Sequence, residues 1–117
     1  MNKILDEVIG KNLLFAGWTE RKALVLGFEG LKTLQLQPVP NVDGITVEKA
    51  EASEHELAED IQIQPLVGSP LYAWWQIVNN AGITDGVMLA FSPNSGIVFS
   101  VMASSIQLLS VAGDQFA

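Results

Sequence analysis

The side chains best suited to acid–base or metal chemistry are concentrated in one acidic segment, residues 51–60. It contains the single histidine of the chain, His55, one helical turn before Glu59, and such a pair can share a metal ion. A metal site needs further ligands, and the chain has no cysteine and no second histidine to supply them. We therefore predict no metal and no cofactor, and interpret the segment as a solvated acidic surface.

Catalysis has little support in the sequence. No serine lies in the Gly-x-Ser-x-Gly arrangement that exposes a nucleophile at a strand-to-helix turn. The remaining option is Asp85 as a base with Tyr72 as its acid. Because Asp85 follows a turn and precedes a glycine, we interpret it instead as a turn-forming residue. We expect a protein without catalytic residues.

Polar and aromatic side chains gather in the stretch 71–80, which we predict to be a strand followed by a turn. Since successive side chains of a strand point to opposite faces, Tyr72, Trp74 and Gln76 share one face and Trp75 lies on the other. One tryptophan can fill the core, and an exposed one beside a tyrosine and amides is typical of a binding hot spot. The alternative is a sheet covered on both sides, in which both tryptophans pack. The candidate binding residues are Tyr72, Trp74, Gln76 and Asn79.

Charge is distributed unevenly along the chain, whose net charge is −7. All six lysines and arginines lie in the first 49 positions, so the second half carries only acids. Binding to phosphates needs basic side chains, and we therefore expect no nucleic-acid partner and no anionic membrane surface. A basic protein partner would be attracted to the acidic segment, with Glu54, Glu56 and Glu59 as candidate contacts. The alternative is that acidity only keeps an apolar domain soluble.

The elements that must position these residues are predicted to form one domain, residues 1–117, of the α+β class and mainly antiparallel β-sheet. A short helix is expected at 4–9, ended by Gly10, and another at 54–60, where Ser53 and Glu56 form a capping box. Pro38 and Pro40 are expected to end the third strand. Strands are predicted at 13–18, 23–29, 33–37, 45–48, 71–78, 86–91, 97–102 and 106–111.

The two halves of the chain resemble each other. Residues 8–13 match 66–71 in an apolar pair, a glycine and a leucine, and residues 24–28 match 87–91. Each half would be an apolar-glycine segment followed by a four-stranded meander. The half-repeats would be 8–48 and 66–111, joined by a linker helix at 53–61. Chance similarity between β-rich segments is the alternative.

Composition favours self-association. Hydrophobic residues make up 49% of the chain and charged residues only 16%, which is more apolar surface than one core of this size can hide. Several strands of the second half are apolar on both faces and need a covering layer from the helix, the first half or another subunit. We therefore predict a homo-oligomer. A turn at 93–96 and several serines interrupt the uncharged run 86–113, so we expect no membrane span. The lack of cysteine and of an export signal favours the cytoplasm.

One pattern resembles a known family. The sequence from Gly68 to Phe91 reads G-x-P-L-x-x-W-W-x-x-x-N-x-x-G-x-x-D-G-x-x-L-x-F. It is similar to a family of small uncharacterised bacterial proteins, some encoded in mobile gene cassettes or near toxin genes. The resemblance covers mainly residues 68–111 and implies no known reaction and no established site. Such a context would suit an immunity-type or other accessory protein.

These observations favour a non-catalytic protein-binding protein that neutralises a basic partner such as a toxin or nuclease. Steering would come from the acidic segment and anchoring from Tyr72 and Trp74. One alternative is a small-molecule-binding protein or enzyme with an aromatic pocket lined by Trp74 or Trp75. Another is a structural subunit that only assembles with itself.

Overall fold

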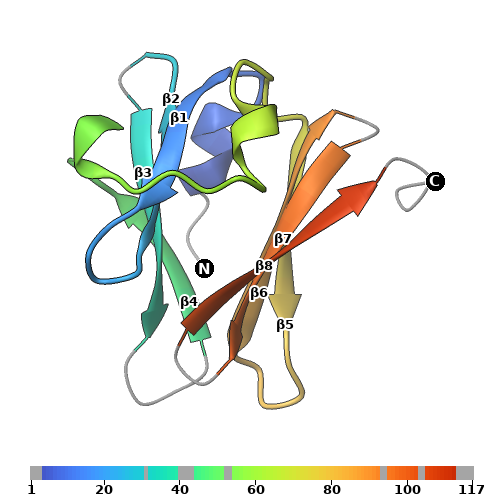
Figure 1. Ribbon diagram of the computed structural model, residues 1–117. Helices are drawn as coiled ribbons and strands as arrows, with labels where there is room; N and C mark the ends of the chain where they lie inside the picture. Colours follow the sequence, from blue (N-terminus) through green and yellow to red (C-terminus); the bar gives the residue numbers. More distant parts are fainter. Residues whose placement is uncertain are drawn as a thin grey trace.

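Two four-stranded antiparallel sheets make up most of the fold (Figure 1). The computed structural model describes residues 4–30, 32–39, 44–51, 54–92, 95–102 and 105–112. The first sheet has the order β1 (Leu13–Trp18), β2 (Leu24–Phe28), β3 (Lys32–Val39) and β4 (Gly44–Lys49). The second has the order β5 (Ala73–Val78), β6 (Thr84–Ser92), β7 (Ser95–Met102) and β8 (Ser105–Ala112). Neighbours in each sheet are consecutive in the chain, so each sheet is a meander.

The prediction of a mainly antiparallel fold is confirmed, and its α component is wrong for the described residues. β1 has the predicted bounds, and the other strands overlap their predicted ranges. In place of α-helices, the described part of the chain has three short 3-10 turns: η1 (Ile4–Val8), η2 (Glu54–Glu56) and η3 (Gln64–Leu66). The predicted helix at 4–9 is η1, which buries Ile4, Leu5 and Val8 and is followed by Gly10 at a φ of +84°.

The acidic segment is not helical because its backbone bonds to β1 instead. The amide of Ala58 donates to the Trp18 carbonyl at 2.9 Å, and the amide of Trp18 donates to the Ala58 carbonyl at 2.8 Å. In an α-helix the Ala58 amide would bond to Glu54, so this bridge replaces the helical bond. Ser53 of the predicted capping box lies outside the described residues.

The third strand passes through a proline that we expected to end it. Pro38 lies within β3 and is opposite Ile45 of β4. On the other side of β3, the pairing with β2 reaches only Leu36, opposite Leu24. Pro38 therefore has a neighbouring strand on one side alone, and its missing N–H can be tolerated there. Pro40 lies outside the described residues.

The core lies between the two sheets, where β4 packs against β6 and β7 and β3 packs against β8. The rings of Phe28 and Phe91 are stacked at its centre, with centroids 6.4 Å apart and planes 5° apart. In β3, Leu34 and Leu36 are buried and their polar neighbours are half-buried, as the alternation predicts. The two sheets are thus joined by one apolar layer.

The two apolar-glycine segments, 8–13 and 66–71, bind each other in a reciprocal way. The amide of Gly10 donates to the Leu71 carbonyl at 2.8 Å, and that of Gly68 donates to the Leu13 carbonyl at 2.7 Å. Exchanging Gly10 with Gly68 and Leu13 with Leu71 converts one of these bonds into the other. A second pair follows the same rule, from Leu71 to Lys11 and from Leu13 to Ser69. The repeat of whole halves stays a prediction, and these bonds favour it.

None of the described helical segments has the length and apolar character needed to cross a bilayer.

Candidate functional site

The acidic linker, which we define as residues 54–60, lies along the edge of β1. Besides the two backbone bonds between Trp18 and Ala58, the indole N–H of Trp18 donates to Asp60 Oδ2 at 2.8 Å. The linker also lies directly over Gly17, since a Cβ at that position would be 2.7 Å from Leu57 Cβ and 2.8 Å from the Ala58 carbonyl oxygen. Only glycine leaves room for the linker there.

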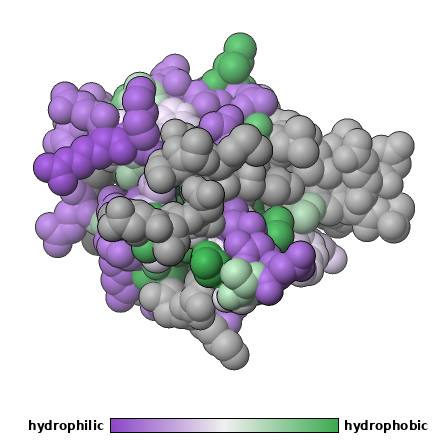
Figure 2. All heavy atoms as spheres, turned by 90° about the horizontal axis from the view of Figure 1, so that it is seen from below, coloured by the Kyte–Doolittle hydropathy of each residue, from purple (hydrophilic) through white to green (hydrophobic). Residues whose placement is uncertain are grey.

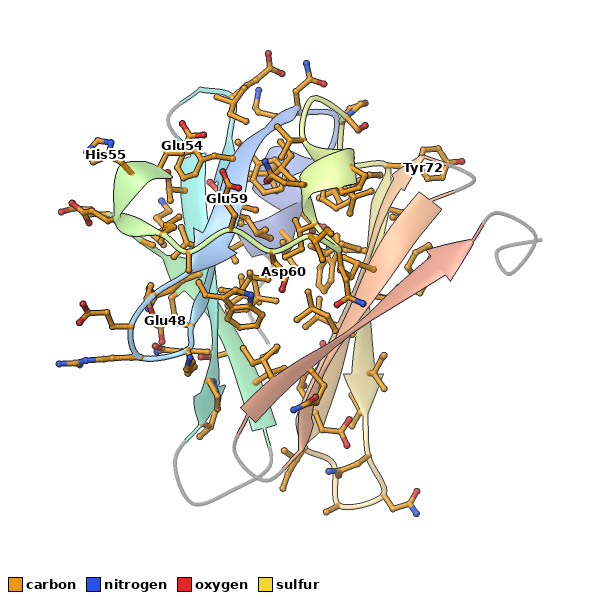
Figure 3. The ribbon with its side chains drawn as sticks, viewed as in Figure 1. Glu48, Glu54, His55, Glu59, Asp60 and Tyr72 are labelled. Atoms are coloured by element: carbon orange, nitrogen blue, oxygen red, sulfur yellow. The ribbon has the colours of Figure 1, made fainter. Side chains whose placement is uncertain are left out.

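The predicted acidic contacts lie on this linker and face solvent. Glu54, Glu56 and Glu59 are all exposed, and Figure 3 shows Glu54 and Glu59 on the same side of the molecule as the first sheet. Hydrophilic side chains gather on that side in Figure 2 as well. The imidazole of His55 lies on the outer side of η2, away from Glu59 (Figure 3). No group of three or more possible metal ligands occurs among the described residues.

The aromatic edge, which we define as residues 72–78, comprises β5 and the tyrosine before it. β5 pairs with β6 and forms one edge of the second sheet. Four large apolar side chains here are substantially exposed: Tyr72 at 59%, Trp75 at 47%, Ile77 at 40% and Val78 at 51%. The segment contains no charged residue and no proline. It is therefore an apolar strand edge open to solvent.

The candidate residues at this edge fall into two groups. Tyr72 and Gln76 are exposed, and the Gln76 amide bonds to the Thr84 hydroxyl. Trp74 is half-buried against the core, and its indole N–H donates to Asp6 Oδ1 at 2.7 Å. Asn79 Oδ1 accepts the amides of residues 81 and 83 at 2.9 and 3.1 Å, so Asn79 holds the turn after β5.

Sequence reasoning missed two exposed residues, Trp75 and Ile77. It left open which tryptophan fills the core, and the structure assigns that place to Trp74. The signal that could have found them is the apolar series at every second position, Ala73, Trp75 and Ile77, on the face opposite Trp74. When a strand is apolar on both faces and only one face packs against the core, the apolar side chains of the other face are exposed.

The structure does not bring the proposed acid–base pair together. Tyr72 precedes the first residue of β5, whereas Asp85 lies in the bulge opposite the last two residues of that strand. Five to six residues of extended chain separate the two positions, which corresponds to about 15–20 Å. Direct proton transfer between them is excluded at that separation.

The predicted docking surface is divided into two. Figure 3 places Glu54 and Glu59 on the side of the first sheet and Tyr72 at the opposite side, beyond the second sheet. A partner that touches the aromatic edge therefore does not touch the acidic linker of the same molecule unless it spans the fold. Steering and anchoring belong to separate surfaces.

A cavity of about 230 Å³ lies under the acidic linker and is lined in part by Glu54, His55, Leu57 and Glu59. Two larger cavities lie elsewhere in the fold. A cleft of about 490 Å³ lies between η1 and the strands β3 and β4, with the charged residues Glu7, Lys49 and Glu51 in its lining. An apolar depression of about 510 Å³ lies beside the aromatic edge and is lined by Ile9, Gly10, Ser69, Pro70, Leu71, Tyr72 and Phe91. Neither cavity is lined by a tryptophan. Ile9, the residue after η1, is 46% exposed here.

Comparison with known proteins gives one match. A family model described as "Family of unknown function (DUF6334)" matches residues 1–113. This confirms the resemblance to an uncharacterised family and extends it over nearly the whole chain. The search of curated proteins gave no match, and the search of solved structures gave none either.

Proposed function

We propose that this chain, which belongs to the family of unknown function DUF6334, is a non-catalytic protein-binding protein. The observation that carries the proposal is the aromatic edge, an uncharged strand edge with four large apolar side chains between 40% and 59% exposed. Tyrosine and tryptophan dominate the centres of protein interfaces. An open strand edge also offers unpaired backbone groups to a partner strand.

The energetic argument concerns the area that a partner would cover. Fully burying an exposed isoleucine or valine side chain contributes about 1.5–3 kcal/mol. Ile77 and Val78 are 40% and 51% exposed, so covering the rest of each would contribute about half of that. Tyr72 and Trp75 offer larger areas and lose little side-chain entropy on binding. The four side chains would form the apolar centre of a larger contact.

The acidic linker supports a second contact within the same proposal. Its backbone is held on β1 at Ala58, and the Trp18 indole holds the carboxylate of Asp60. A fixed group of like charges attracts an oppositely charged protein and raises its association rate. We propose a basic protein as the partner at this surface. A bacterial immunity-type role in the cytoplasm, suggested by the resemblance to proteins of mobile gene cassettes, belongs to this proposal.

The test is co-purification of the tagged chain with the products of its neighbouring genes, followed by measurement of the binding rates. A triple variant, Glu54→Lys with Glu56→Lys and Glu59→Lys, should slow association with a basic partner by at least about tenfold at low salt. The matched control is Glu20→Lys with Glu48→Lys and Asp85→Lys, which makes the same change of net charge outside the linker. Equal association rates for the triple variant and the native chain would contradict the role of the linker.

A second candidate function is the binding of a small molecule in the cleft beside η1. Its volume of about 490 Å³ is in the range of small-molecule sites, and it combines apolar walls with Lys49 and two carboxylates. A ligand screen read by thermal melting distinguishes this candidate from the first. A ligand that raises the Tm of the native chain but not that of Lys49→Ala would favour it.

A further inference from the structure

We infer that the aromatic edge binds the aromatic edge of a second copy of this chain, with the two β5 strands antiparallel across a twofold axis. The inference rests on the proposed function, since it names the occupant of the same surface. In the resulting dimer the two second sheets would form one continuous eight-stranded sheet. Three observations support this arrangement: the state of the other strand edges, the distribution of charge, and the corresponding position in the first half.

Two of the other edges, β1 and β4, are protected and β5 is not. The fourth edge, β8, also lacks charge and proline, but it packs against β3 of the first sheet. β1 is bonded at Leu13 by residues 68 and 69 and at Trp18 by Ala58 of the linker. β4 carries two exposed charged residues, Glu48 and Lys49. Cover, charge and proline are the usual means by which a protein prevents edge-to-edge pairing. β5 has none of the three along Ala73–Val78, which indicates an edge that is paired in the working protein.

Charge favours a second copy as the occupant. Two copies with a net charge of −7 each repel, so they can associate only where carboxylates are few. The aromatic edge is such a place, because the nearest acids along its paired elements are Asp85 in the β6 bulge and Asp6 bonded to Trp74. A basic partner would gain no electrostatic attraction from this edge. An antiparallel strand, by contrast, is complementary to itself across a twofold axis.

The corresponding position in the first half shows how this place in the fold is covered. Gly17 is paired with Val25 of β2, and Trp75 is paired with Met88 of β6. The match of residues 24–28 with 87–91 aligns these two partners and therefore Gly17 with Trp75. Over Gly17 lies the linker, so close that no side chain fits. At the matching place in the second half, the Trp75 indole fills the space above the strand and is 47% exposed. Whatever covers β5 there must therefore leave room for an indole.

A register centred on Trp75 meets that requirement. It places Trp75 opposite Trp75 of the second copy, where two indoles can pack in an offset stack. The small Ala73 then faces the larger Ile77 of the other copy on the same side of the sheet. Pairs of this kind, directly opposite on one face, are the contacts that stabilise antiparallel strands.

The experiment measures the mass of the untagged full chain in solution by sedimentation or light scattering at micromolar concentration. We expect a dimer for the native chain. Ile77→Lys should raise the dimer dissociation constant by at least about 30-fold, because it places an unpaired charge on each side of the contact. The matched control is Ile61→Lys, since Ile61 is 88% exposed and lies in the segment that leaves the linker. It should leave the dimer intact.

A cross-linking variant tests the register without relying on a destabilising change. The chain has no cysteine, so Trp75→Cys introduces a single thiol. Opposite Cβ atoms in an antiparallel pair are about 4.5–5.5 Å apart, close to the distance that a disulfide requires. Mild oxidation should therefore convert Trp75→Cys into a covalent dimer, whereas Glu56→Cys on the linker should stay monomeric in denaturing gels.

The outcomes separate the inference from the function on which it rests. A native chain that is monomeric overturns the dimer. If it then binds a different protein and Ile77→Lys abolishes that binding, the protein-binding function stands. If Ile77→Lys leaves that binding unchanged, the dimer and the binding role of the aromatic edge both fail, and only the contact at the acidic linker is left to carry the proposed function. A native dimer that survives Ile77→Lys and gives no cross-link through Trp75→Cys overturns the assignment to β5.

Discussion

The two meanders of this protein have the same strand order but differ in how their first strand is covered. At the far end of β1, Trp18 is paired with Ala58 and the linker lies over Gly17. At the far end of β5, the side chains of Ile77 and Val78 are 40% and 51% exposed. The end of the first strand is thus covered by the linker in the first half and exposed to solvent in the second half. We expect binding at the exposed end, on β5.

In each half, one tryptophan is held by a carboxylate from a distant segment of the chain. In the first half the indole of Trp18 bonds to Asp60, in the segment that leads to η3. In the second half the indole of Trp74 bonds to Asp6, in η1. Each tryptophan is thus held by a carboxylate from the segment that leads into the other half. Because Trp18 and Trp74 are not at matching positions in the two halves, this likeness is one of arrangement, and the repeat stays a prediction.

The largest effect should come from the shared core, where the two halves contribute one phenylalanine each. Phe28→Ala and Phe91→Ala should each lower the free energy of unfolding by about 3–5 kcal/mol. Because the two rings stack at 6.4 Å, the double variant should lose less than the sum of the two. Urea unfolding of the four proteins measures this. Strict additivity would contradict a single core joining the sheets.

A medium effect is expected where the halves differ most, at Gly17. Gly17→Val should destabilise the protein by about 1–3 kcal/mol, because its Cβ would overlap Leu57 and the Ala58 carbonyl. The linker should detach, and limited proteolysis should then cut it faster than in the native chain. Ala81→Val in the exposed turn after β5 is the control, with a change within about 0.5 kcal/mol. Unchanged proteolysis in Gly17→Val would show that the linker is not held on β1.

Most of the fold was predictable because strands and turns are encoded locally. The alternation of Leu34 and Leu36 with polar residues and the turn residues around Gly82 fixed the strands to within a few residues. The apolar-glycine match marked two similar segments, although it did not predict that they bind each other. Both signals depend on neighbours in the chain, which sequence reasoning can see.

The linker and the tryptophans were not predictable because distant contacts decide them. The capping pattern at Ser53 and Glu56 favours a helix locally, yet Ala58 bonds to Trp18, forty residues earlier. Alternation separates Trp74 from Trp75 but cannot say which face the first sheet covers. The sequence suggested both a turn-forming role and a binding role for Asn79. Its bonds to the amides of residues 81 and 83 show that it forms the turn.

The smallest effect concerns the two equivalent turns, Thr19–Ala23 and Asn79–Ile83. Both have a bond from the first amide to the fifth carbonyl at 2.9 Å, and in both the first side chain accepts the fifth amide. The fourth residue has a positive φ in each, 65° at Lys22 and 80° at Gly82. Left-handed backbone costs a side-chain-bearing residue about 1 kcal/mol.

Replacing Lys22 by glycine should therefore stabilise the protein, whereas Gly82→Lys should destabilise it. We expect changes of about 0.5–1 kcal/mol in opposite directions, with the gain at Lys22 reduced by the extra freedom that glycine gives the unfolded chain. Thermal unfolding of both variants measures this, with Lys22→Ala as the control for loss of the lysine side chain. A shift of the same sign in the two variants would mean that the turns are not equivalent, and would weaken the case for a duplicated half.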